Sequence, residues 1–139
     1  MEKIELDLKS ILIKLKDMLP EHRLRHSEGV AESAVKLSEI YGYNKEKAYL
    51  AGILHDCAKY LNEEEVNYFV NKYGIQLDSY EKNNIALSHS IIGAVLAKNE
   101  FSIQDEEIIE AIRYHTTGKE NMNNLEKIVY MADLIEENR

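Results

Sequence analysis

The stretch AYLAGILHD at residues 48–56 joins an almost wholly apolar run to the adjacent ionisable pair His55-Asp56. An apolar run that surrounds the helix axis on nearly all sides is typical of a central buried helix, which we expect over residues 45–59. An unpartnered charge buried there would cost on the order of several kcal/mol. Something must therefore satisfy the pair, and a metal ion would do so.

Other candidate ligands occur in similar apolar, helix-periodic surroundings elsewhere in the chain. They are His26, His89, His115 and Asp133. One histidine on an apolar face is more often a hydrogen-bonded core residue, but several such residues on different helices favour a metal centre. Neutral imidazoles and carboxylates together suit iron, manganese or zinc, whereas magnesium alone favours oxygen ligands. Six side chains exceed what one catalytic metal takes, so we expect two metals.

Periodic apolar residues predict an all-α fold. Further helices are expected at residues 4–19, 24–41, 62–74, 85–98, 105–116 and 125–135. Pro20 and Gly42 should end the first two, and Gly74 the fourth. Residues 75–84 are expected to form a polar connection. On this pattern His26, His89 and His115 all point inward from apolar stripes.

Composition points to one soluble domain over residues 1–139, with 45% hydrophobic residues and a single proline. The chain contains no apolar run of the roughly 18 residues that span a membrane, and its start does not resemble a signal peptide. One cysteine, Cys57, permits no internal disulfide, so a reducing cytoplasm is the expected location. We expect Cys57 to be a small core side chain.

The formal net charge of −8 argues against a general nucleic-acid surface. A small anionic substrate remains compatible with it, because metals and a few basic residues could create a positive pocket inside an acidic shell. The basic candidates are Arg23, Lys59, Arg113 and Lys119. Each of them could equally be an ordinary solvated side chain.

The order His26, His55-Asp56 and Asp133 resembles the signature of the HD superfamily of metal-dependent phosphohydrolases. His89 and His115 match the members that hold two metals. Longer segments resemble one family more closely, the YqeK-type symmetrical diadenosine tetraphosphate hydrolases. These segments are EHRLRHSEGV (21–30), ILHDCAK (53–59), AIRYHTTG (111–118) and LEKIVYMADLIE (125–136).

This resemblance implies an all-α HD-domain helical bundle with a buried metal site. It implies that His26, His55, Asp56 and Asp133 hold one metal, and that Asp56 bridges to a second metal at His89 and His115. Two metals about 3.5 to 4 Å apart can lower the pKa of a shared water and present hydroxide to phosphorus. The implied reaction is symmetrical hydrolysis of diadenosine tetraphosphate to two ADP by a metal-bound hydroxide. Iron is the expected metal, with manganese, zinc, cobalt and magnesium as alternatives.

The resemblance also implies roles for residues around the metals. We take His55, Asp56 and Lys59 as catalytic residues. Substrate contacts are expected from Arg23, Lys59, Thr116, Thr117 and Gly118. Lys59 could instead be a helix-end lysine that interacts with the dipole. Gly118 could be only a C-cap and the threonines only loop residues.

The chain departs from the family after Asp133. Family members continue with a proline after Ile-Glu and further helices, whereas this chain ends in Glu136-Glu137-Asn138-Arg139. We therefore expect an HD domain without the C-terminal extension, whose aliphatic surface would suit a homodimer. The alternatives are an HD-type nucleotidase, a deoxynucleoside triphosphate or alarmone phosphohydrolase, and a nucleotide-binding regulator without catalysis.

Overall fold

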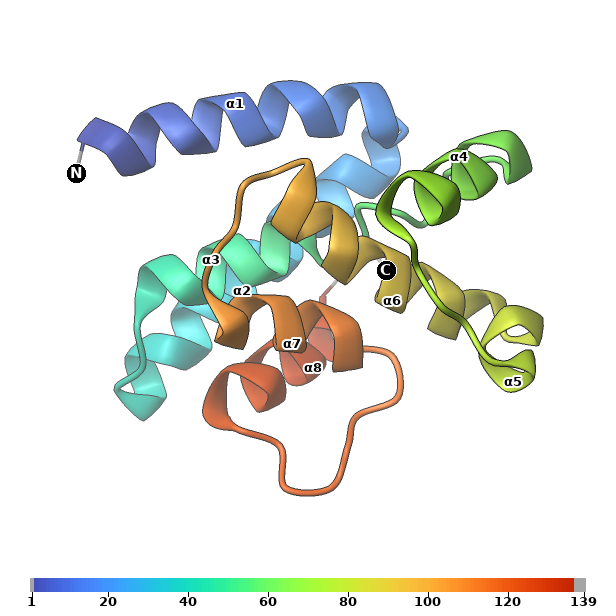
Figure 1. Ribbon diagram of the computed structural model, residues 1–139. Helices are drawn as coiled ribbons and strands as arrows, with labels where there is room; N and C mark the ends of the chain where they lie inside the picture. Colours follow the sequence, from blue (N-terminus) through green and yellow to red (C-terminus); the bar gives the residue numbers. More distant parts are fainter. Residues whose placement is uncertain (1, 137–139) are drawn as a thin grey trace.

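The computed structural model describes the backbone of residues 2–136 and the side chains of residues 8–136 (Figure 1). Within residues 2–136 it contains eight α-helices and no β-strand. The helices are α1 (Glu2–Met18), α2 (Glu21–Tyr41), α3 (Lys45–Leu54), α4 (Glu63–Tyr73), α5 (Ser79–Asn83), α6 (Ile85–Asn99), α7 (Glu106–Tyr114) and α8 (Asn124–Ile135). The all-α prediction is confirmed. No helix in these residues has the length and apolarity that crossing a membrane requires.

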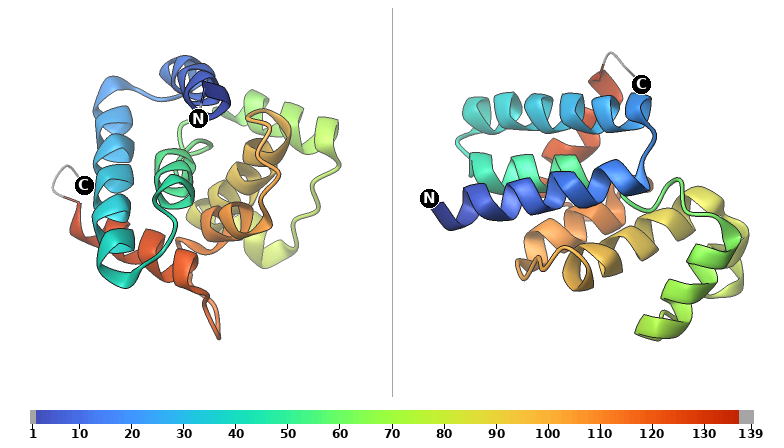
Figure 2. Two further views of the ribbon diagram at one scale, coloured as in Figure 1. Left: turned by 90° about the vertical axis from the view of Figure 1, so that its left-hand side faces the viewer. Right: turned by 90° about the horizontal axis from the view of Figure 1, so that it is seen from above.

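The helix α3 lies at the centre of the bundle, against α2, α7 and α8. Helices α2 and α3 form a hairpin and lie side by side, while α8 crosses close to them (Figure 2). Helix α6 packs on α7, both α4 and the five-residue α5 contact α6, and α1 contacts α2. A Cβ atom at Gly52 would lie 2.7 Å from the Ala31 Cα, so the glycine permits the close approach of α2 and α3.

The core is apolar along α3, as its sequence predicts. Ala48, Ala51, Ile53 and Leu54 are each fully buried. The neighbouring helices add the large side chains of Leu15, Val30, Ile92, Leu96, Ile112, Leu125 and Val129, which are also fully buried. This packing leaves the polar side chains that follow α3 facing the interior.

Most expected helix ends are confirmed. Gly42 and Gly74 follow α2 and α4 in the left-handed region, with φ of 69° and 60°. The Asn62 side chain accepts from the Glu65 N–H, and Glu65 accepts from the Asn62 N–H, so a capping box begins α4. Helix α2 begins earlier than expected, at Glu21, because Pro20 serves as its N-cap in an extended conformation.

The prediction that the third helix runs to Lys59 is wrong, since α3 ends at Leu54. In a longer helix the Gly52 carbonyl would accept from the Asp56 N–H. It instead accepts from the Nδ1 of His55 at 2.7 Å and from the His55 N–H at 3.5 Å. The chain continues in tight turns, with the Cys57 N–H donating to the Leu54 carbonyl. Helix α3 ends here because the His55 side chain hydrogen-bonds to a carbonyl of its own last turn.

The same local arrangement ends α7 at Tyr114, two residues before the predicted end. The Nδ1 atom of His115 lies 2.6 Å from the Ile112 carbonyl oxygen. The expected polar connection at 75–84 also contains an unpredicted helix, α5, which begins with a capping box between Asp78 and Glu81. That pairing is visible in the sequence as an Asp followed three residues later by a Glu.

Candidate metal centre

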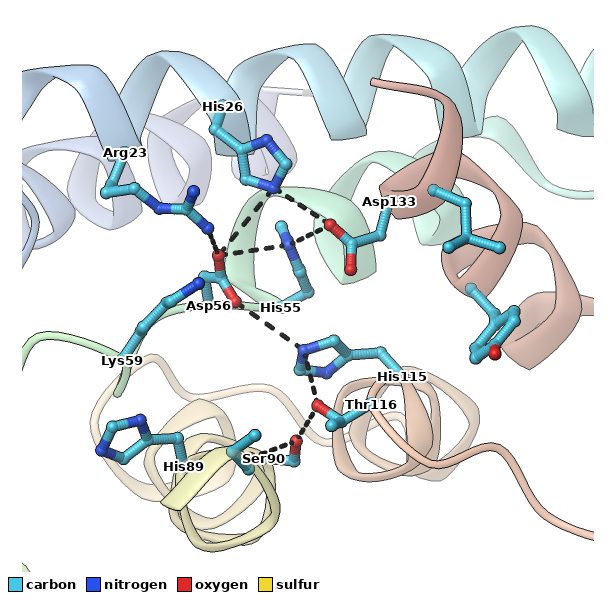
Figure 3. Close-up of a pocket in the computed structure, with 13 residues that line it drawn as sticks. Arg23, His26, His55, Asp56, Lys59, His89, Ser90, His115, Thr116 and Asp133 are labelled. Carbon is cyan, nitrogen blue, oxygen red and sulfur yellow. Dashed lines mark hydrogen bonds and ion pairs between the residues drawn. The ribbon is translucent and has the colours of Figure 1, made fainter. Parts of the chain in front are cut away.

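Histidines and aspartates from four parts of the bundle converge on one point (Figure 3). His26 comes from α2, His55 and Asp56 from the turn after α3, His115 from the end of α7, and Asp133 from α8. The closest ligand atoms are His26 Nε2 and Asp133 Oδ1, which lie 3.0 Å apart. His55 Nε2 lies 3.4 Å from Asp133 Oδ1 and 3.5 Å from Asp56 Oδ2. His115 Nε2 lies 3.7 Å from Asp56 Oδ1.

Each of these imidazoles is held by its other nitrogen. A carbonyl oxygen only accepts hydrogen bonds, so the Nδ1 atoms of His55 and His115 carry the proton that they share with Gly52 and Ile112. In the neutral imidazole Nε2 is then a lone-pair donor that points at the aspartates. The Nδ1 of His26 donates in the same way to the Glu136 carboxylate, at 3.2 Å. Such partners orient metal-binding histidines.

The geometry of the site suits a bound cation. His55 Nε2 is buried without a hydrogen-bond partner in the described part of the chain, although two carboxylate oxygens lie within 3.5 Å. In each of two sets of three residues, the possible ligand atoms all lie within 4.8 Å of one another. The sets are His26, His55 and Asp56, and His55, His115 and Asp133. This nitrogen and oxygen set fits a divalent transition metal, because neutral imidazole and carboxylate are its ordinary ligands.

The electrostatics keep both aspartates ionised. Burial alone would raise the pKa of Asp56, but His55, His115 and Lys59 outweigh burial and hold that pKa well below its ordinary range. Burial likewise opposes ionisation of Asp133, but the neighbouring imidazoles of His26 and His55 outweigh burial and lower the pKa of this carboxyl. Both carboxylates are therefore available as anionic ligands at neutral pH.

A cavity of about 290 Å³ opens beside these ligands. It is lined by Arg23, His26, His55, Asp56, Lys59, Ala86, His89, Ser90, His115, Thr116, Tyr130, Asp133 and Leu134. Arg23 donates to Asp56 Oδ2 at 2.5 Å, and both side chains are largely buried. The predicted basic residues Arg23 and Lys59 thus lie at the cavity, the latter on the turn after α3 rather than on a helix.

Arg113 and Lys119 do not line this cavity, contrary to the expectation of a larger positive pocket. The Arg113 guanidinium lies over the Tyr114 ring. Lys119 pairs with Glu126 at 3.1 Å and with Glu110 at 3.4 Å. The Lys119 ammonium is therefore held by these two carboxylates and does not contribute to the cavity.

His89 lies on the cavity wall but apart from the other predicted ligands. It is half-buried, and Figure 3 shows its ring directed away from His115. It belongs to neither of the close ligand groupings found among the described side chains. The next residue on α6, Ser90, is the fully buried one that faces Thr116. Burial is the main cause that lowers the pKa of His89, and the positive charge of the nearby Lys59 adds to it. The imidazole is therefore neutral at neutral pH.

The predicted substrate loop follows His115. The Thr116 hydroxyl lies at the cavity, 2.5 Å from the Ser90 hydroxyl and 3.2 Å from His115 Nε2. The Thr117 hydroxyl donates instead to the Gly118 carbonyl. Gly118 has φ of 67° and donates its N–H to Tyr114, which is a helix-ending arrangement. Of these three residues, Thr116 alone lines the cavity.

Sequence reasoning missed three polar residues at or beside the site, Ser90, Tyr130 and Glu136. Ser90 could have been found as the neighbour of His89 on a buried helix. Glu136 follows Asp133 by three residues, close to one helical turn, which could have suggested a second carboxylate on the same face. Residues 137–139, where the chain departs from the family pattern, lie outside the described residues.

Comparison with known proteins agrees with this centre. The model of the family described as HD domain matches residues 23–138. A symmetrical bis(5'-nucleosyl)-tetraphosphatase from Halalkalibacterium halodurans is 42% identical over 125 residues, which are 90% of this chain and 66% of that protein. The enzyme of the same name from Bacillus subtilis is 41% identical over 125 residues, 90% of this chain and 67% of that protein. The chain thus spans about two thirds of these relatives.

A solved structure is similar over nearly the whole chain. It is the crystal structure of a predicted HD superfamily hydrolase involved in NAD metabolism from Clostridium acetobutylicum. The two are 42% identical with a TM-score of 0.88, over 95% of this chain and 70% of that one. The resemblance read from the four sequence segments is confirmed at the level of the family. The chain belongs to the HD domain family.

Proposed function

We propose that this protein hydrolyses diadenosine tetraphosphate symmetrically, to two ADP, with two divalent metal ions. The observation that carries the proposal is the convergence of three imidazole Nε2 atoms on two ionised aspartates, beside the cations Arg23 and Lys59. Relatives at 41 and 42% identity that bear the name of this activity give the reaction and the substrate.

The spacing of the ligand atoms and the family resemblance support an assignment of residues to the two metals. His26, His55, Asp56 and Asp133 would hold one ion. Asp56 offers its Oδ1 to the side of His115, so it would bridge to a second ion. In this proposal His89 turns its neutral ring from the cavity wall to complete the second set. We take iron as the natural metal, because a mixed nitrogen and oxygen set suits it.

The bound metals would polarise phosphate oxygens and lower the pKa of a water molecule next to phosphorus. The chain's own residues would bind and orient the phosphates. Arg23 now donates to Asp56, and once Asp56 binds metal this guanidinium is free to turn toward a phosphate, which it can bind through two hydrogen bonds. Lys59 and the Thr116 hydroxyl would contact neighbouring oxygens of the same phosphate chain.

The volume of the cavity limits how much of the substrate it can hold. A volume of about 290 Å³ lies at the lower end of the range for small-molecule sites. We propose that it takes the central phosphates, while both adenosines lie at or beyond its mouth. In that arrangement the bond cleaved is set by which phosphorus the metals reach.

The test is hydrolysis of diadenosine tetraphosphate by anaerobically iron-loaded protein, with the products resolved by chromatography. We expect ADP as sole product, and loss of turnover in His55→Ala and Asp56→Ala. Lys36→Ala, an exposed change on α2, is the matched control and should keep full activity. ATP with AMP as products would overturn the symmetrical reaction. No turnover despite two bound metals would redirect the search to other phosphate esters.

We further propose that residues 1–139 form one HD domain, that it acts in the cytoplasm, and that it forms a homodimer. Support for the dimer comes from large apolar side chains that are at least two-fifths exposed on α8. They are Met131, Leu134 and Ile135. Light scattering after size-exclusion chromatography measures the mass directly, and a monomer at micromolar concentration would refute the dimer.

A further inference from the structure

Both ring nitrogens of His26 contact carboxylates from the C-terminal end of α8. The Nε2 atom lies 3.0 Å from Asp133 Oδ1, and the Nδ1 atom lies 3.2 Å from Glu136 Oε2. The imidazole is fully buried, and the Glu136 side chain is only 6% exposed. A carboxylate buried to this extent needs a strong partner, and the His26 N–H is one.

The opposite helix is shaped to receive this carboxylate. Gly29 lies three residues after His26, on the same face of α2. A Cβ atom at Gly29 would stand 2.1 Å from Glu136 Oε1 and 2.5 Å from Glu136 Cδ. A side chain of any size at this position would therefore collide with the carboxylate. The absence of one leaves the space that Glu136 occupies.

The partner of His26 differs from those of the other two inward histidines. His55 and His115 donate to neutral backbone carbonyls, whereas His26 donates to an anion. An anionic partner pulls the Nδ1 proton and so increases electron density at Nε2. The result is a stronger metal ligand, held in one tautomer and one ring orientation.

We propose that Glu136 is a positioning residue that orients and strengthens His26 as a metal ligand, with Gly29 as the gap that admits it. This inference rests on the proposed metal centre. It assigns a role to a residue outside the proposed set of metal ligands. It also means that the end of α8 supplies both a ligand, Asp133, and the support for a ligand on α2.

The test is titration of the metal-free, full-length protein with Co²⁺, followed by its visible absorption spectrum. Glu136→Gln keeps the size of the side chain and an oxygen acceptor but removes the charge. We expect it to weaken Co²⁺ binding about 10- to 100-fold, the range typical for loss of such a partner. Gly29→Ala leaves the carboxylate in the chain but displaces it, and should weaken binding similarly.

The double variant Gly29→Ala/Glu136→Gln makes the test specific. If both changes act through the same contact, their effects on Co²⁺ affinity should not add, and the double variant should bind nearly as well as the weaker single variant. The controls are Gly93→Ala, whose added Cβ meets only ordinary contacts beyond 3.5 Å, and Glu28→Gln, an exposed neighbour of Gly29. Both should bind Co²⁺ as the parent protein does.

The outcomes separate this inference from the proposed function. If the parent protein binds no Co²⁺, the metal centre itself is refuted. If the parent binds and Glu136→Gln binds equally tightly with an unchanged spectrum, the positioning role is refuted. A lower melting temperature of the metal-free variants with unchanged Co²⁺ affinity would also overturn it, because Glu136 would then serve the fold alone.

Discussion

His26 Nε2 and Asp133 Oδ1 lie 3.0 Å apart although 107 positions of sequence separate the two residues. The contact joins α2 to α8 and closes the bundle at the site where metal is proposed to bind. The other candidate ligands, His55, Asp56 and His115, come from the turns after α3 and α7. Affinity for metal should therefore depend on residues from all four elements.

Asp133→Asn tests that dependence with little change of shape. The amide removes the negative charge that faces both His26 and His55, so we expect metal affinity to fall at least tenfold and hydrolysis to fall with it. Metal content after dialysis and the rate of ADP formation measure the two effects. Asp17→Asn, an exposed change on α1, is the control. Full metal content in Asp133→Asn would contradict the assignment.

Gly52→Ala tests the spacing of the central hairpin. Its Cβ would lie 2.7 Å from the Ala31 Cα, a backbone atom that can move only with its helix. Forcing α2 and α3 apart should lower the free energy of unfolding by about 1–3 kcal/mol, the usual cost of overpacking. Urea denaturation of the metal-free protein measures it. Gly93→Ala, where space is available, should cost much less, and equal costs would refute this explanation.

The cap of α7 predicts a matched pair of variants. Asp105 accepts from the N–H groups of Glu107 and Ile108 and forms an ion pair with Lys47 at 2.9 Å. Asp105→Ala should cost about 1 kcal/mol of unfolding free energy through the lost cap. Asp105→Asn keeps a capping oxygen and should cost less. Thermal and urea unfolding at neutral pH distinguish them, and the reverse order would exclude the capping role.

The same aspartate predicts a pH dependence. Burial is the largest single effect and opposes ionisation, but the Lys47 ammonium and the capping N–H groups together outweigh it and lower the pKa of Asp105 below its ordinary value. A carboxyl whose folded pKa is lowered stabilises the protein above its unfolded pKa, and that contribution disappears as the pH falls. The difference in melting temperature between the parent and Asp105→Asn should therefore shrink between pH 6 and pH 3. A difference that grows on acidification would contradict this sign.

Cys57 should be unreactive in the folded protein. Burial raises the pKa of its thiol to about 12, and the side chain is fully buried. At pH 8 a disulfide reagent needs the thiolate and access to it, so reaction should wait for unfolding. We expect no modification of the native protein over minutes and complete modification in denaturant. Rapid native modification would show that this region opens readily.

Thr116 and Ser90 predict a hydroxyl effect on phosphate binding. Thr116→Val keeps the shape of the side chain but removes the hydroxyl that lies between Ser90 and His115. Loss of one such hydrogen bond, about 1 kcal/mol, should lower kcat/KM about fivefold. Thr116→Ser should restore most of it. Steady-state hydrolysis measures both, and equal rates for Thr116→Val and the parent would remove Thr116 from the substrate site.

Much of the fold was predictable from local sequence. Asn62 with Glu65 marks the start of α4, and Gly42 and Gly74 mark helix ends, because caps and glycine conformations depend on residues a few positions apart. The ends of α3 and α7 were not predicted. They depend on whether the His55 and His115 side chains bond their own backbone, which a periodic apolar pattern cannot reveal.

The candidate site, like the fold, was predictable only in part. The ligand types His26, His55, Asp56, His115 and Asp133 were identified from apolar surroundings and from the family resemblance, and the structure brings them together. The prediction that Arg113 and Lys119 contribute to the positive pocket is wrong. Arg113 lies over the Tyr114 ring, and Lys119 forms an ion pair with Glu126. Charge alone does not say which of several partners a long side chain will reach.

The sequence by itself determined where most of the helices lie and which residues are candidates to bind metal, because helix periodicity and capping act over a few neighbouring residues. Only the tertiary structure decided which way each ligand points, that Arg23 pairs with Asp56, and that Glu136 enters the gap at Gly29. These contacts join positions that are tens of residues apart, up to 110 for His26 and Glu136. Their existence depends on how the helices pack, which no local pattern encodes.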